Sequence, residues 1–564
     1  MNREDVQKAI ADIVGPQWVS TDPCMTENYA YYMNPEFGNK EGGRFLTQPV
    51  AAVLPASSEE VSQIMKLCNK KDISVKPIST GWHAACAVSR ENVVVLDLKR
   101  MDKIIDIDVK NKIAVVEPYV KAINLQTQLW KEGLNLHVIS SGGNHSPLAS
   151  ITAAWGYGLT GPGCGFNGRN LMGAEWVLPT GEILTLGSAG DGLGWFSAEG
   201  PGPSLRGIMR GVWGSCGGFG VFTKCGIKLY NWDGPTDIEV EGHNPEYIVK
   251  DLPTNIGFFN LSFQSKADIA EAGYKMGEAG ITYADFRLGP FYIAQAKARD
   301  SLELKNLWES GVLQKMMNHT MNTVVIGYSQ QEFEWKVKVL YKIIEECNGV
   351  RLPMSTEISE KEMKALSRIT RFVDDPVKLL NRLPFLPNLM EKLSPKKVKI
   401  KKNISDLFLV MLRHATNTKG NFKASGGLAT CMGTFDTWDL GLEQMDLYIE
   451  RKREAIKEGH ILDDGGDLGA GGTYESGHMG YIEGIILYNP GDPKSNLATA
   501  KLVEDMTDAC IDNYMGIPLT GWGDEMNRRF GPHCSNYDQW MEKIITTFDP
   551  NQAMDSAMYI EPGK

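Results

Sequence analysis

The pattern of apolar and polar positions predicts alternating strands and helices in the first part of the chain. Residues 49–55 form a short apolar run between two prolines, which is typical of a strand. Ser57 and Glu60 then complete the S-x-x-E pattern of a helix start. The apolar side chains that follow repeat at the spacing of one helix face: Val61, Ile64, Met65 and Cys68.

Three more strand patterns and a second helix follow. Residues 73–79 and 92–98 read as strands, and 104–120 reads as a hairpin. A helix is expected over 122–132, because Gly133 follows it as a helix stop. The order β-α-β-β-β-α predicts an α+β domain rather than a repeating parallel array.

The rest of the chain suggests a second domain. Glycine is dense in residues 141–226 and sparser from about 236 to 500, where helical and strand patterns alternate. Residues 500–564 contain two helix patterns separated by a glycine-rich turn at 521–523. Domains are therefore expected at 1–235 and 236–500, with a C-terminal segment at 501–564.

Composition narrows the class of protein. The chain has 59 glycines in 564 residues, above the usual ~7%, and a net charge of −11, which argues against a nucleic-acid partner. No apolar run is long enough to span a bilayer and the N-terminus has no signal core, so a cytoplasmic location is expected. None of the ten cysteines forms a C-x-x-C pair, and no metal site is expected.

Two glycine-containing loops follow predicted strands. They are Ser79-Thr80-Gly81-Trp82-His83 and Ser140-Ser141-Gly142-Gly143-Asn144-His145-Ser146. Successive backbone N–H groups in such turns form anion-binding nests, and a diphosphate is the natural guest. A third stretch, Gly156 to Gly161, matches G-x-G-x-x-G but continues into Pro162-Gly163, which predicts an extended loop. A dinucleotide fingerprint must instead open a helix, so a Rossmann-type NAD site is not expected.

The succession of motifs resembles the FAD-linked oxidase superfamily of the vanillyl-alcohol oxidase and p-cresol methylhydroxylase type. It covers residues 47–230 and the last 60 residues. The matching runs are P-I-S-T-G-W-H (77–83), V-V-V-L-D-L (93–98), V-V-E-P-Y-V (115–120), S-G-G-N (141–144), E-W-V-L-P-T-G-E-I-L (175–184), G-F-G-V-F-T-K (218–224), Gly521-Trp522-Gly523 and Asp549-Pro550-Asn551.

The resemblance implies an α+β fold with a two-subdomain FAD-binding domain and an α+β cap domain that carries an antiparallel sheet. It implies FAD as cofactor and oxidation of a small organic substrate, an alcohol or hydroxy acid, by hydride transfer to flavin N5. The expected cofactor-binding residues are Pro77, Ile78, Ser79, Thr80, Gly81, Trp82, His83, Pro118, Ser141, Gly142, Gly143, Asn144, Ser146, Gly156, Gly158, Gly161, Gly165, Gly220, Val221 and Arg529.

The sequence departs from the phenol-oxidising members of this superfamily. In those proteins a tyrosine and an arginine that hold the phenolate follow the Gly-Trp-Gly turn, and here Glu525 and Met526 occupy these positions. A para-phenol substrate is therefore not expected, although Arg528 could hold an anionic substrate bidentately. His83 occupies the place of a histidine that bonds covalently to the flavin in related proteins, so both a covalent and a non-covalent FAD remain open.

Candidate catalytic groups lie in the predicted cap. His478 precedes the strand pattern 482–488, and Arg413 with His414 follows the apolar run 407–412. A histidine titrates near neutral pH and could accept the substrate's hydroxyl proton.

Partners and alternative functions stay open at this point. The basic, apolar-interleaved segment 376–402 is either a solvated insertion or a docking element for a membrane surface or an electron-acceptor protein. A homo-oligomer is expected. The alternative functions are a non-redox flavin enzyme of the alkylglycerone-phosphate-synthase type and a flavin subunit that relays electrons in a larger complex.

Overall fold

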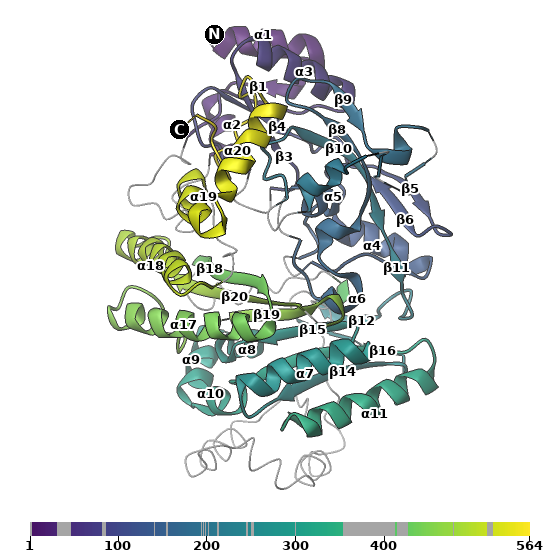
Figure 1. The fold of residues 1–564 in the computed structure, drawn as a ribbon, viewed down its shortest axis with the longest axis vertical. Coiled ribbons are helices and arrows are strands. Elements are labelled where there is room, and N and C mark those ends of the chain that lie inside the picture. The colour runs from purple at the N-terminus through teal and green to yellow at the C-terminus, as the bar shows by residue number, and fades with distance from the viewer. Residues whose placement is uncertain are drawn as a thin grey trace.

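Both ends of the chain build the upper part of the molecule, and its middle builds the lower part (Figure 1). The computed structural model describes residues 3–563 except for the following positions: 31–46, 82–85, 140–141, 154–155, 193, 196, 198, 201, 211–213, 244–245, 250–252, 299, 353–411, 414–426, 468, 478 and 516–522. The chain thus leaves its first domain, builds a cap, and returns.

The first subdomain contains a four-stranded sheet in the order β1-β2-β4-β3, in which β2, β4 and β3 run parallel. Ser57 caps α3 by accepting a hydrogen bond from the Glu60 backbone N–H, as the S-x-x-E pattern predicts. The elements are α1 (Arg3–Val14), β1 (Val19–Ser20), α2 (Pro23–Thr26), β2 (Ala51–Val53), α3 (Ser58–Lys70), β3 (Ser74–Ile78) and β4 (Val93–Asp97).

The second subdomain is a five-stranded antiparallel sheet in the order β5-β6-β10-β8-β9. The hairpin at 104–120 and the helix at 122–132 are confirmed within a few residues. The elements are β5 (Ile104–Asp108), β6 (Ile113–Val116), α4 (Ala122–Lys131), α5 (Pro147–Thr152), α6 (Gly161–Cys164), β8 (Leu171–Val177), β9 (Ile183–Thr185) and β10 (Val221–Lys228), with the small pair β7 (Leu134–Asn135) and β11 (Tyr230–Asn231).

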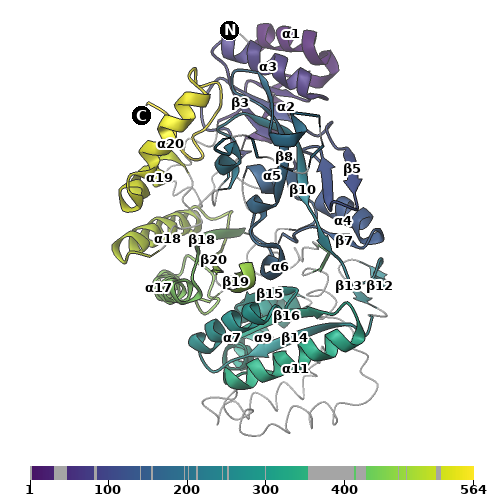
Figure 2. The same cartoon turned by 45° about the vertical axis from the view of Figure 1, so that its right-hand side comes forward.

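The prediction of an extended loop after Gly161 is wrong, because residues 161–164 form one helical turn, α6. Pro162 stands at the first turn of this helix, where its missing N–H costs nothing, and Gly165 ends it at φ +66°. Both views place α6 at the border between the upper part and the cap sheet (Figures 1 and 2). The turn therefore belongs to the junction of the two parts.

The cap contains a seven-stranded sheet in the order β17-β14-β16-β15-β19-β20-β18, and every pairing in it is antiparallel. Its strands are β14 (Ile256–Ser262), β15 (Ala284–Leu288), β16 (Thr320–Ile326), β17 (Val350–Arg351), β18 (Gly427–Asp436), β19 (Gly469–Tyr474) and β20 (Met479–Tyr488). Its helices are α7 (Lys266–Ala279), α8 (Pro290–Lys297), α9 (Ser301–Glu309), α10 (Val312–Met316), α11 (Gln330–Glu346), α17 (Trp438–Lys457) and α18 (Pro493–Asp512); the hairpin β12 (Val240–His243) and β13 (Glu246–Val249) precedes the sheet.

The two faces of the cap sheet have separate apolar cores. Helices α7, α11, α17 and α18 cover one face, where Ile482 and Ile486 of β20 are buried. The opposite face buries Ile485 and Leu487 against α8–α10 and against residues of the upper part such as Leu159. Strand alternation thus assigns odd-numbered positions of β20 to the side that meets the upper part.

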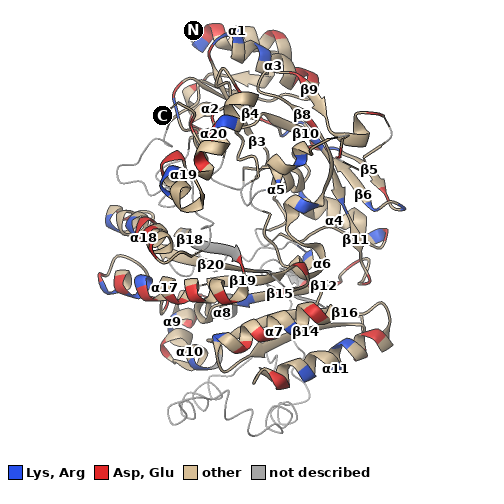
Figure 3. Cartoon of the chain, in the orientation of Figure 1, with Lys and Arg blue, Asp and Glu red and all other residues tan. Residues whose placement is uncertain are grey.

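The C-terminal return begins later than residue 500. Helix α18 runs through that position and packs in the cap core through Leu502, Val503 and Met506. Helices α19 (Asp524–Phe530) and α20 (Tyr537–Phe548) then cross to the upper part, where Ile545 joins the core of the second subdomain. Many Lys, Arg, Asp and Glu positions fall in the helices, for example in α11, α17 and α18 (Figure 3). No helix among the described residues is long and apolar enough to cross a membrane.

The buried carboxyl group of Asp285 in β15 should make the stability of the cap depend on pH. It is fully buried, its carboxylate accepts hydrogen bonds from Thr282 and Thr323, and burial raises its pKa from 3.8 to about 6. A raised pKa means that the folded state holds this proton more tightly, so the Asp285 contribution to stability falls as pH rises through 4–6. We expect Asp285→Asn to gain about 3 kcal/mol relative to the wild type between pH 4 and pH 7, at ~1.4 kcal/mol per pKa unit.

Thermal midpoints of both proteins across this pH range check the prediction. Asp512→Asn on the exposed side of α18 is the matched control and should follow the wild-type profile. Parallel profiles for Asp285→Asn and wild type would contradict the assignment.

Candidate functional site

A cavity opens between the two sheets of the upper domain. Of the residues expected to bind a cofactor, nine line it together: Pro77, Ile78, Ser79, Thr80, Gly81, Pro118, Ser146, Gly220 and Val221. They come from the end of β3, the segment after β6, the start of α5 and the start of β10.

The C-terminal segment holds the first of these loops in place. Val75 of β3 donates its N–H to the Ala553 carbonyl (2.8 Å) and accepts a hydrogen bond from the Asp555 N–H (3.0 Å). The segment therefore continues the parallel sheet beside β3. Residues 77–81 at the end of this strand are fixed by residues that lie more than 470 positions away in the sequence.

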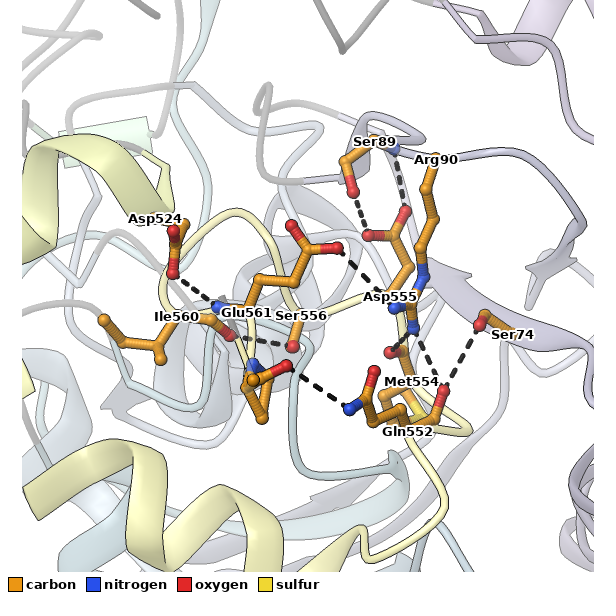
Figure 4. Close-up of polar contacts among 12 residues, drawn as sticks. Ser74, Ser89, Arg90, Asp524, Gln552, Met554, Asp555, Ser556, Ile560 and Glu561 are labelled. Carbon is orange, nitrogen blue, oxygen red and sulfur yellow. Dashed lines mark hydrogen bonds and ion pairs between the residues drawn. The ribbon is translucent and has the colours of Figure 1, made fainter. Parts of the chain in front are cut away.

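Asp555 is the center of this attachment (Figure 4). Its buried carboxylate accepts hydrogen bonds from the backbone N–H (2.8 Å) and hydroxyl of Ser89, and the Lys76 ammonium donates to its backbone carbonyl (2.6 Å) and lies 3.7 Å from its carboxylate. Arg90 donates to the carbonyls of Gln552 and Met554. A buried ion pair is costly to break on one side, because the remaining charge has no partner.

The loop at 142–146 lies beside the cavity. Ser146 donates its hydroxyl to the Pro118 carbonyl (2.6 Å) and caps α5 at Ala149. Gly142, Gly143 and Asn144 do not line the cavity; Gly143 instead accepts a hydrogen bond from the Ile123 N–H of α4. Burial lowers the pKa of His145 to about 4, so its imidazole is neutral at pH 7.

The 214–220 segment supplies bare backbone and an unused donor. Gly220 has φ +111°, and a Cβ on it would lie 2.3 Å from the Val177 carbonyl oxygen, so only glycine fits. The Ser215 hydroxyl lines the cavity, is buried, and has no hydrogen-bond partner among the described residues. An unpaired buried hydroxyl calls for a polar ligand group.

The other four candidate glycines lie outside this cavity. A Cβ on Gly158 would meet the Val138 carbonyl oxygen at 2.1 Å, and one on Gly161 would meet the Thr473 carbonyl oxygen of β19 at 2.4 Å. Gly156 packs on Phe166, and Gly165 approaches Glu475 of the cap. These glycines permit close packing within the loop and against the cap, rather than lining the described cavity.

The candidate arginines are engaged elsewhere. Arg528 pairs with Asp524 and Glu542, and Arg529 pairs with Glu504 and Asp508. Arg413 lies over the Trp130 ring at 4.6 Å and donates to Thr127 on α4. None of the three lines the cavity.

Five further candidates, Trp82, His83, Ser141, His414 and His478, lie outside the described residues. Among the described residues no group of three or more side chains is placed to hold a metal ion. Asp464 and Asp467 are buried and paired with Lys452 and Arg287, respectively.

The structure adds a group of side chains that sequence reasoning missed. Tyr157 of the upper domain stacks on Tyr481 of β20, with ring centroids 4.7 Å apart, and both contact Tyr474 edge-on. The nearby Glu483 carboxylate contributes to raising the pKa values of Tyr157 and Tyr474 far above 10, although burial is the larger cause. A signal existed in the sequence, because Tyr481 and Glu483 stand two positions apart at the start of the predicted strand 482–488, a spacing that puts both on one face.

Comparison with known proteins defines the class. Residues 49–187 match the family model of the FAD binding domain. The chain is 32% identical over 190 residues to the 4-cresol dehydrogenase [hydroxylating] flavoprotein subunit of Pseudomonas putida, which covers 32% of this chain and 35% of that protein. It is 24% identical over 237 residues to glycolate oxidase subunit GlcD of Bacillus subtilis, covering 41% and 45%. This chain thus spans less than half the length of these relatives.

The fold extends the likeness to the whole chain. The crystal structure of p-cresol methylhydroxylase with substrate bound superposes with a TM-score of 0.69 at 16% identity, covering 99% of this chain and 97% of that one. The predicted fold, an FAD-binding domain with a cap that carries an antiparallel sheet, is confirmed. Residues 49–187 thus match an FAD binding domain, and the chain as a whole has the fold of p-cresol methylhydroxylase.

The cavity fits FAD as the cofactor. Residues 79–81 together with Gly217 and Gly220 offer a cradle of backbone with few bulky side chains, and the Ser215 hydroxyl is free to bond a ligand. Apolar Ile78, Leu98 and Val221 provide walls for a planar ring system. These are the residues that would hold FAD.

Gly220→Ala tests this cradle. The added methyl would collide with the Val177 carbonyl and would strain a backbone at positive φ by about 1–3 kcal/mol, so we expect loss of most bound FAD. The absorbance ratio of flavin to protein after purification measures the result. Gly207→Ala, where a Cβ meets open space, is the matched control and should retain FAD; equal flavin content in both variants would argue against the cradle.

Proposed function

We propose that this protein is an FAD-dependent oxidoreductase that oxidises a small organic substrate bearing a hydroxyl group, an alcohol or a hydroxy acid. One observation carries the proposal. The cavity is lined in part by the backbone of Gly81, Gly217 and Gly220 and by the unpaired Ser215 hydroxyl, and the adjoining residues 49–187 match an FAD binding domain. The relatives include a 4-cresol dehydrogenase subunit and a glycolate oxidase subunit, which favours redox chemistry on small molecules.

When bound, FAD would supply the acceptor for a hydride from the substrate carbon. The chain would supply substrate binding, exclusion of water and a proton acceptor. Glu483 stands at an odd-numbered position of β20, the side that meets the upper domain, and it is 9% exposed. Its carboxylate is largely shielded from water and is therefore a candidate to take the hydroxyl proton. His478 remains the second candidate for this role.

The arginines bear on the substrate class. Arg413, Arg528 and Arg529 have partners within the protein, so none of them supports a carboxylate-binding role. At the positions where phenol oxidases hold the phenolate, Glu525 is exposed and Met526 is buried. We therefore propose an uncharged alcohol before a hydroxy acid as the substrate to test.

The electron acceptor is proposed to be O₂ or a partner protein. Segment 376–402, which the sequence leaves open as a solvated insertion or a docking element, lies outside the described residues. The cytoplasmic location and the homo-oligomer stay predictions.

The visible spectrum of the purified protein is the direct test. We expect flavin absorbance that bleaches anaerobically on addition of an alcohol or hydroxy acid and returns on reoxidation. Protein without flavin would overturn the proposal, and flavin that no such substrate bleaches would favour the non-redox or electron-relay alternatives. Acid precipitation of the same sample reports the bond to His83: a yellow pellet means covalent FAD, which His83→Ala should release.

Glu483→Gln separates proton transfer from cofactor binding. We expect unchanged FAD content, because Glu483 does not line the cavity, and a rate of flavin reduction about 100-fold lower, because general-base catalysis is lost. Stopped-flow absorbance measures this rate. Glu443→Gln on the exposed side of α17 is the control; a reduction rate in Glu483→Gln equal to that of the control would exclude Glu483 as the base.

A further inference from the structure

One hydroxyl of the cap satisfies both backbone groups of a residue in the upper domain. The Gly158 N–H donates to the Tyr474 phenol oxygen (2.5 Å), and the Tyr474 hydroxyl donates back to the Gly158 carbonyl (3.0 Å). Tyr474 is fully buried, and no side chain larger than hydrogen fits at Gly158. The end of β19 is thereby pinned to one point of the Gly156–Gly165 loop.

The next cap residue makes a second contact across the same junction. Glu475 forms an ion pair with Arg169, which lies in a short 3₁₀ turn (Asn167–Asn170) of the upper domain. The Arg169 side chain is 39% exposed and that of Glu475 is 19% exposed. Glu475 also borders Gly165, where a Cβ would lie 3.3 Å from its carboxylate. The pair thus lies at the rim of the buried contact made by Tyr474.

The turn that carries these contacts has an uncommon backbone. Glu475, Ser476 and Gly477 have φ values of +48°, +60° and +93°, a left-handed run that includes two residues with side chains. From behind, Gly277 of α7 packs directly on Gly477, since a Cβ on Gly277 would lie 2.3 Å from the Gly477 Cα. Such conformations persist when neighbouring structure enforces them, and they cluster at functional sites.

The turn also leads into β20, the strand whose side chains meet the upper domain. It joins β19 to β20, and β20 carries Tyr481, which stacks on Tyr157, and Glu483 two residues further. A shift of the turn would move these side chains relative to the upper domain. Arg169, Tyr474 and Glu475 do not line the cavity, so changes there leave the proposed FAD cradle intact.

We propose that Tyr474 and the Arg169–Glu475 pair form a junction latch, which holds the strained turn 475–477 against the upper domain and so positions Glu483 for the proposed reaction. The inference rests on the proposed function for its effect on turnover, but not for its effect on the junction. The three side chains are positioning residues.

A charge-reversal cycle tests the ion pair. We expect Arg169→Glu and Glu475→Arg each to lower the rate of flavin reduction about fivefold at unchanged FAD content. The double reversal should restore it to within about twofold of wild type, because the pair re-forms with opposite polarity. Reversing Lys305 and Glu309, an exposed pair on α9, is the matched control and should change nothing. Additive losses without rescue would overturn the pairing.

Tyr474→Phe tests the buried contact without relying on a substrate. The ring stays, but Gly158 loses both hydrogen bonds, so amide hydrogen exchange in the peptide that contains residues 156–161 should become at least tenfold faster. Unchanged exchange would overturn the latch, whatever the function proves to be. Faster exchange with wild-type flavin reduction would assign Tyr474 a structural role only and would overturn the positioning role. If no substrate bleaches the flavin, the proposed function fails while exchange still decides the latch.

Discussion

The attachment of the C-terminal segment to β3 is the interaction on which the cofactor domain depends. Backbone pairing of Val75 with Ala553 and Asp555 adds the end of the chain to the edge of the parallel sheet. The buried Asp555 carboxylate then ties this edge to Ser89 and Lys76. The loop that lines the cavity leaves the same strand, so the geometry of the proposed FAD site is set by contacts between the two ends of the chain.

A second constraint is that backbone segments approach each other closely at glycines, and it acts in two places. At Gly220, beside the cavity, it brings the start of β10 against Val177 of β8. At Gly158 and Gly161 it lets one loop lie directly on Val138 and on strand β19 of the cap. Glycine excess in this chain thus supports both a cofactor cradle and a tight seam between domains. The two roles look the same in sequence, since both require only the absence of a side chain.

Buried charge is handled locally in the cap. Lys452 pairs with Asp464, and Arg287 pairs with Asp467, so these charges are satisfied inside the cap. At the junction Tyr157, Tyr474 and Tyr481 pack together, and the Glu483 carboxylate lies near them. Arg528 and Arg529 of α19 form ion pairs with acidic side chains on neighbouring helices. Arg413, Arg528 and Arg529 thus all have partners inside the protein, in keeping with the proposed uncharged substrate.

Local pattern determined much of this protein. The helix cap at Ser57, the hairpins, the helix over 122–132 and the two glycine loops follow from short-range spacing, and the family resemblance follows from their order. Nine cofactor candidates meet in one cavity because each is the end of a predicted strand or loop. Tertiary structure alone decided what the remaining candidates contact. Arg528 pairs with Glu542, Arg529 pairs with Asp508, and Gly161 packs against Thr473 of the cap. It also brought Tyr157 to Tyr474 and Glu483, because these two contacts join residues more than 300 positions apart, and no local periodicity encodes such a distance.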